Sequence, residues 1–173
     1  MGYVPVRGDC LEGTVNSVSN EVQELPAEGR DRLDALFRSD PLMSELGAEL
    51  LAWSPGLATV QAIVQVAHTN FIGGGHGGIV FSLGDIAMSF ASNGYGRQAL
   101  ATQIDISYHR GVLPGDLVVA TASEISRTRR FAHHRVEMKV NERLVASATG
   151  TTYRTDEWHF GAEFWPDEWR GKY

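Results

Sequence analysis

The feature that most constrains the fold is a helical stretch at residues 79–91 that is apolar nearly all round. Its apolar positions recur at helical spacing and form one stripe, which consists of Ile79, Val80, Leu83, Ile86, Ala87, Phe90 and Ala91. Phe81, Asp85, Met88 and Ser92 lie beside or opposite this stripe, so no face is properly polar. The pattern predicts a buried helix, which other elements of the chain must cover.

Four segments after this helix have the alternation typical of strands, at residues 100–108, 116–125, 131–140 and 144–153. Apolar and polar side chains alternate along them, which indicates antiparallel strands with one wet face. Asn141-Glu142 supplies a turn of two residues and predicts a tight hairpin. We therefore expect an α+β fold in which one long buried helix packs against an antiparallel sheet.

The chain divides into three parts. Residues 1–30 have few apolar positions and read as a loose N-terminal extension, residues 31–154 as the compact domain, and residues 155–173 as a Trp-rich C-terminal tail. Apolar positions at residues 31–51 recur at helical spacing, with a break or restart at Pro41. We expect the tail to dock on its own or a neighbouring subunit rather than to cover the substrate.

Composition excludes several classes of protein. The 15 Lys and Arg residues against 21 Asp and Glu give a net charge of −6, which disfavours binding to nucleic acid or to an anionic membrane. The single Cys10 forms no intrachain disulfide. No apolar run approaches the ~18 residues of a membrane span, so we expect a cytoplasmic protein.

The glycine-rich loop at residues 73–78 has the Gly-x-Gly-x-x-Gly spacing of dinucleotide-binding loops. No second helix follows to build a parallel sheet, so we reject that function. A helix N-terminus with free N–H groups can still hold developing negative charge, which makes the Gly77 amide a candidate oxyanion donor. The alternative is that His76 and the glycines only form a tight turn.

Asp85 is a carboxylate on the helix that should be buried. An unpaired buried carboxylate costs several kcal/mol, roughly, so Asp85 is either satisfied by hydrogen bonds or kept for chemistry. Gly77 and Asp85 are eight residues apart, or roughly 12 Å along one helix. If two such helices pack antiparallel, Asp85 of one chain approaches Gly77 of the other, which predicts a dimer.

Three motifs carry a resemblance to a known family. They are residues 70–85, with Gly-Gly-Gly-His-Gly-Gly at their centre, then Ala91-Ser92-Asn93, and then Leu113-Pro114-Gly115-Asp116. Together they resemble the hotdog-fold acyl-CoA thioesterases of the phenylacetate-degradation (PaaI) and 4-hydroxybenzoyl-CoA thioesterase type. Residues 108–111 (Tyr-His-Arg-Gly) depart from the Arg-Pro that relatives usually carry there.

The resemblance implies a role for each matching residue. Gly77 would polarise the thioester carbonyl through its N–H, and Asp85 of the partner chain would be the nucleophile or the base for water. Asn70 matches the position of an amide side chain near the water or the carbonyl. His76 matches the histidine that shapes the loop, and Ser89 matches a hydroxyl position beside the carboxylate. The resemblance also implies dimers that often stack as tetramers, and no cofactor beyond the CoA of the substrate.

Two further clusters leave alternatives open. Arg127, Arg129 and Arg130 are either a solvated turn or a grip on the phosphates of CoA. A zinc site of His68, His76 and Asp85 is conceivable, but the resemblance to metal-free enzymes disfavours it.

These observations predict a hydrolase that cleaves aryl- or medium-chain acyl-CoA to acid and CoA. A non-catalytic acyl-CoA binder or sensor on the same fold, and a hotdog enoyl-CoA hydratase, are the alternatives. The sequence determines neither the acyl group nor the choice between nucleophile and general base for Asp85.

Overall fold

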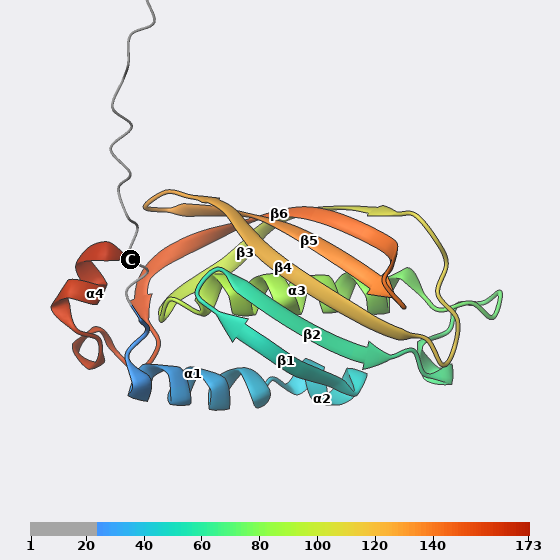
Figure 1. The fold of residues 1–173 in the computed structure, drawn as a ribbon, viewed down its shortest axis with the longest axis horizontal. Coiled ribbons are helices and arrows are strands. Elements are labelled where there is room, and N and C mark those ends of the chain that lie inside the picture. Colours follow the sequence, from blue (N-terminus) through green and yellow to red (C-terminus); the bar gives the residue numbers. More distant parts are fainter. Residues whose placement is uncertain (1–23) are drawn as a thin grey trace, which may run out of the picture.

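The computed structural model describes residues 24–173 as a six-stranded antiparallel sheet with one long helix packed against it (Figure 1). The strands lie in the order β1 (Ala48–Ser54), β2 (Leu57–Ile63), β4 (Leu117–Arg127), β5 (Phe131–Val140), β6 (Arg143–Trp158) and β3 (Arg97–Tyr108). The helix α3 (Gly77–Asn93) contacts all six strands. The predicted fold class is confirmed, and the antiparallel pairing of these strands rules out a dinucleotide-binding unit.

The sheet buries one face against α3. Along β5 every second side chain is buried, namely Ala132, His134, Val136, Met138 and Val140, while the others face outward. Asn141 and Glu142 have φ of 49° and 63°, the left-handed backbone that a two-residue hairpin requires. The hairpin predicted there is confirmed.

One stripe of α3 remains open in the single chain. Phe81 is 37% exposed, and Asp85 and Ser89 are half-buried. The stripe recurs every four residues and so follows one side of the helix. The pattern predicts a buried helix, and in the single chain the sheet covers α3 on the sides away from this stripe.

The N-terminal elements differ from the prediction. Helix α1 (Ala27–Arg38) begins inside the segment predicted as a loose extension, and residues 1–23, with Cys10, lie outside the described part of the chain. Helix α2 (Pro41–Leu46) restarts at Pro41 as expected. The helical pattern does not continue to residue 51, because Gly47 turns with φ 61° and the next residues form β1.

The C-terminal tail docks on its own chain. Strand β6 runs on to Trp158, and the short helices η2 (Ala162–Phe164) and α4 (Asp167–Lys172) follow. Trp165 and Trp169 are buried, and the Trp169 indole Nε1 donates to the Tyr95 main-chain oxygen at 2.8 Å. Of the outcomes expected for the tail, docking on its own subunit is the one observed.

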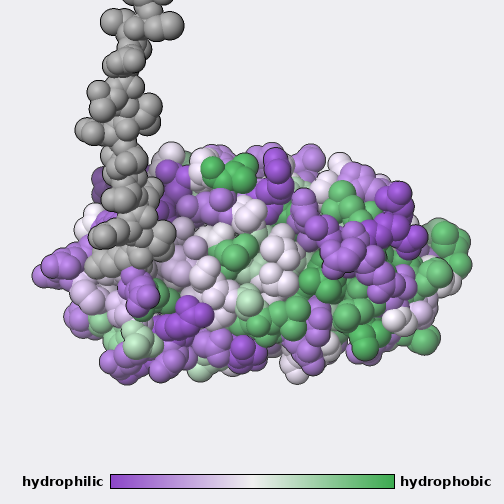
Figure 2. Space-filling model, in the orientation of Figure 1, coloured by the Kyte–Doolittle hydropathy of each residue, from purple (hydrophilic) through white to green (hydrophobic). Residues whose placement is uncertain are grey.

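Among residues 24–173, no helix lies over the outer face of the sheet (Figure 1). Figure 2 shows apolar side chains on this side of the molecule. The exposed apolar residues of β1, β2 and β4 include Leu51, Leu57, Ile63 and Leu117, which are 40–56% exposed. Strand β3 forms one edge of the sheet and is exposed over most of its length. No helix among residues 24–173 is long and apolar enough to cross a membrane.

Candidate active site

The Gly77 N–H lies at the first turn of α3 and has no acceptor among residues 24–173. His76 precedes the helix as its N-cap, and its ring Nδ1 accepts from the Gly78 N–H at 2.9 Å. The cap satisfies the neighbouring amide and leaves that of Gly77 available. A helix N-terminus concentrates partial positive charge, so this N–H is suited to stabilise an oxyanion.

Tyr108, at the end of β3, closes over this turn. Its hydroxyl donates to the Gly77 carbonyl oxygen at 3.0 Å, and its ring lies 3.1 Å from where a Gly77 Cβ would stand. A side chain at residue 77 would therefore push the ring aside by a few tenths of an ångström. Burial raises the pKa of Tyr108, which keeps the hydroxyl as a donor. Sequence analysis did not assign Tyr108 to the site, because its contact with Gly77 spans 31 residues.

A cleft of about 320 Å³ opens beside the Gly77 amide. Its walls come from the glycine loop, α3 and the segment after β3, and include Gly75, Val80, Tyr108, Gly111 and Val112. The apolar side chains Val80 and Val112 and the tyrosine ring give it a surface suited to an acyl group.

Asn70 fixes the loop that leads to this cleft. Its Oδ1 accepts from the N–H groups of Ile72 and Gly74 at 3.1 and 3.2 Å, and its Nδ2 donates to Gly75 at 3.4 Å. These contacts make Asn70 a positioning residue in the single chain. Its predicted place beside the reacting carbonyl stays a prediction.

Asp85 lies on the open stripe of α3 and does not line the cleft beside Gly77 of the same chain. Its buried Oδ1 has no hydrogen-bond partner among the described residues, and burial raises its pKa. Ser89 follows one turn later, half-buried on the same stripe. Hydrogen bonds within the described chain therefore do not satisfy this carboxylate oxygen. Of the two alternatives, this favours the one in which Asp85 is kept for chemistry.

Among the described residues, the structure shows neither the conceivable zinc site nor the arginine cluster at this cleft. His68, His76 and Asp85 do not form a metal-binding cluster, and no group of three such side chains occurs in residues 24–173. Arg130 instead pairs with both oxygens of Asp156 at 2.8 and 2.9 Å. Arg127 stacks on Tyr95, just beyond the C-terminal end of α3.

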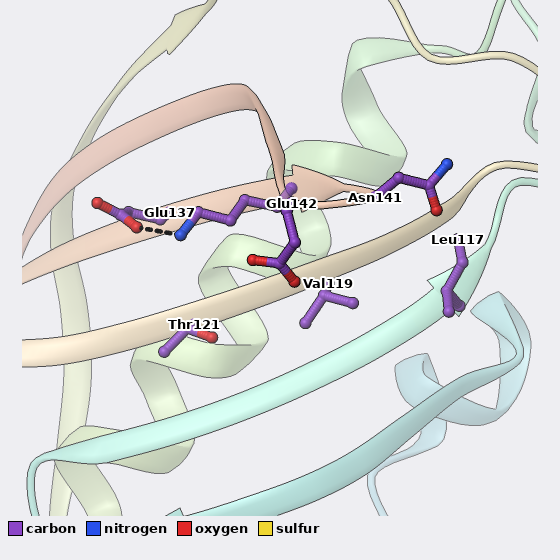
Figure 3. Close-up of a pocket in the computed structure, with 7 residues that line it drawn as sticks. Leu117, Val119, Thr121, Glu137, Asn141 and Glu142 are labelled. Carbon is purple, nitrogen blue, oxygen red and sulfur yellow. Dashed lines mark ion pairs between the residues drawn. The ribbon is translucent and has the colours of Figure 1, made fainter.

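A separate hollow of about 340 Å³ lies on the outer face of the sheet, between the ends of β4 and β5 (Figure 3). Its charged side chains Glu137 and Lys139 pair with each other at 2.9 Å. The sheet separates this hollow from α3, so it shares neither the free amide nor the carboxylate of the helix.

Comparisons with known proteins show the family and the fold of the chain. The family described as "Thioesterase superfamily" matches residues 72–147, which contain the whole helix and its capping loop. "Putative esterase" of Archaeoglobus fulgidus is 37% identical over 125 residues, which cover 72% of this chain and 81% of that one. "Acyl-coenzyme A thioesterase PaaI" of Escherichia coli is 28% identical over 121 residues, 69% of this chain and 86% of that one.

The structure of the E. coli PaaI protein from the phenylacetic acid degradation operon superposes with a TM-score of 0.74 at 26% identity, covering 79% of this chain and 99% of that one. A helix packed on a six-stranded antiparallel sheet is the hotdog architecture that these proteins share. The chain belongs to the thioesterase superfamily as a hotdog thioesterase of the PaaI type, and it is a thioester hydrolase.

Proposed function

We propose that this protein hydrolyses an aryl- or medium-chain acyl-CoA to the free acid and CoA. The observation that carries the proposal is the pairing, on one helix, of an amide without an acceptor at Gly77 and a carboxylate oxygen without a donor at Asp85. Thioester hydrolysis needs a donor for the developing oxyanion and a base or nucleophile for the carbonyl carbon. The relative named an acyl-coenzyme A thioesterase supports CoA as the thiol.

A two-fold dimer brings the two groups to one carbonyl. Along one helix they are roughly 12 Å apart, too far to act on the same atom. Antiparallel packing of two α3 helices through their open stripes would place Asp85 of the partner subunit beside Gly77. The exposed edge strand β3 and the 37% exposed Phe81 support an interface on this side of the chain.

In this arrangement the Gly77 N–H holds the thioester oxygen as negative charge develops on it. Asp85 either removes a proton from the attacking water or attacks the carbonyl itself to form an anhydride that water then cleaves. The carbon–sulfur bond breaks, and CoA leaves as the thiol after taking up a proton. Asn70 and His76 hold the loop, and Ser89 provides a hydroxyl beside the carboxylate.

The test is CoA thiol release from phenylacetyl, hydroxybenzoyl, short, medium and long acyl-CoA. We expect turnover for one acyl class and a loss of about 10²-fold or more in kcat for Asp85→Asn, because the amide is neither base nor nucleophile. Asp31→Asn, at an exposed position on α1, is the matched control and should keep full activity. Undiminished turnover in Asp85→Asn would refute the role of Asp85. Tight acyl-CoA binding without product over hours would favour a binder.

A further inference from the structure

A second pocket lies beyond the C-terminal end of α3, far from the Gly77 cleft. Its volume is about 490 Å³, and six cationic side chains line it: Arg97, Arg127, Arg129, Arg154, Arg170 and Lys172. They come from β3, the end of β4 and the turn after it, β6 and α4, so distant parts of the sequence converge on one place.

Two of these arginines are buried, which distinguishes the pocket from a solvated basic turn. Arg154 is 3% exposed and Arg97 9%. Arg154 donates to the main-chain oxygens of Thr128 and Tyr173, but its Nε has no partner among the described residues. The Arg127 Nη1 also lacks one. Such unsatisfied buried donors are costly, and an anion in the adjoining pocket would lower that cost.

The carboxylate side chains nearby are fewer than the cations. Asp156 is shared between Arg97 and Arg130, Glu124 lies 3.7 Å from Arg127, and Asp167 pairs with Arg170. The Tyr173 main-chain oxygen accepts from both Arg97 and Arg154. Burial and repulsion from Arg127 and Arg97 lower the pKa of Arg154 to about 10. The folded chain therefore holds these cations at an electrostatic cost, which a bound anion would offset.

We propose that this pocket binds a small phosphate-bearing anion at a site separate from the thioester cleft. Guanidinium groups match phosphate oxygens in charge and in hydrogen-bond geometry. The pocket has room for a diphosphate. Arg127 already stacks on the rings of Tyr95 and Tyr173, at 4.1 and 4.8 Å, so recognition rests on the phosphates rather than on stacking of a base.

Distance separates this site from CoA bound at Gly77 of the same chain. The pocket begins where α3 ends, and the 17 residues of the helix extend about 25 Å from Gly77. The phosphates could come from a free metabolite or from CoA held by a partner subunit. We assign the site to a free phosphate compound and let competition by CoA decide.

The experiment is calorimetric titration of the full chain with pyrophosphate at constant ionic strength. We expect one site per chain and binding at least about tenfold weaker in Arg129→Glu, because Arg129 is an exposed rim residue whose charge is reversed without disturbing the core. Arg127→Gln should also weaken binding. Arg143→Glu makes the same charge change at the other end of β5 and should bind like the wild type.

Equal affinity in Arg129→Glu and Arg143→Glu, or no saturable binding to the wild type, would overturn the proposal. So would one-for-one displacement of pyrophosphate by CoA, since the arginines would then hold the substrate's own phosphates. Binding that persists at saturating CoA supports a separate site. None of these measurements depends on thioester hydrolysis, so their failure would leave the proposed function untouched.

Discussion

His134 is a polar residue in the middle of the core. It is 0% exposed on β5, and neither ring nitrogen has a hydrogen-bond partner among the described residues. Burial, with a smaller contribution from His133, lowers its pKa from 6.5 to about 4. The folded protein thus keeps the ring neutral at pH values where the unfolded chain protonates it.

This difference predicts a loss of stability in mild acid. As pH falls from 6.5 towards 4, the unfolded state takes up the proton first, so the free energy of unfolding falls, by about 2 kcal/mol at pH 5 relative to pH 7. Urea denaturation at both pH values measures it, and His134→Leu should flatten the dependence. Burial raises the pKa values of Asp85 and Glu124, so these two groups stabilise the folded state as pH falls. They do so equally in the wild type and in His134→Leu. An equal pH dependence in wild type and variant would contradict the prediction.

At the scale of elements, the Trp165 indole holds the C-terminal segment in place by packing against the backbone at two glycines. Trp165 is 2% exposed, and its ring packs where side chains at Gly29 and Gly96 would stand. Gly96 also has φ 83°, a conformation that favours glycine. These two positions join α1 and the start of β3 to the tail.

Gly96→Ala should therefore destabilise the protein strongly. A Cβ there would lie 2.3 Å from the Trp165 ring, and the backbone would be strained, so we expect a loss of about 2–4 kcal/mol in the free energy of unfolding. Gly171→Ala is the control, because its Cβ meets no atom within 4 Å on α4. Chemical denaturation of the two variants should separate them clearly; similar midpoints would show that the tail adapts.

The element patterns also explain which parts of the fold could be predicted. Strand β5 alternates along its whole length, and Asn141-Glu142 has the residues of a two-residue turn, so local sequence determines both. The sequence pattern predicts helix up to residue 51, where the structure has β1, because the apolar residues of β1 continue the helical spacing of α1 and α2. Only pairing with β2 makes that segment a strand.

At the scale of the whole molecule, the proposed site requires two chains. Asp85→Asn removes the carboxylate, and Gly77→Val puts a side chain against the Tyr108 ring beside the amide. Each variant alone should be inactive. In a mixed dimer, one site would combine the intact Gly77 of one chain with the intact Asp85 of the other.

Refolding or coexpressing the two variants in equal amounts should restore about a quarter of wild-type turnover, because half the dimers are mixed and each has one intact site. Mixing Asp85→Asn with Asp85→Ala should restore none. If the first mixture also remains inactive although mixed dimers form, Gly77 and Asp85 do not act across an interface.

The sequence by itself determined the long apolar helix, its glycine-rich start, the lone carboxylate and the alternating strands, because each depends on residues close together in the chain. The tertiary structure decided what distant residues do to one another. It placed Tyr108 over Gly77, left one stripe of α3 open, packed the tail on its own chain and gathered cationic side chains from distant elements into one pocket. Such contacts are set by the packing of the whole chain, which no local pattern records.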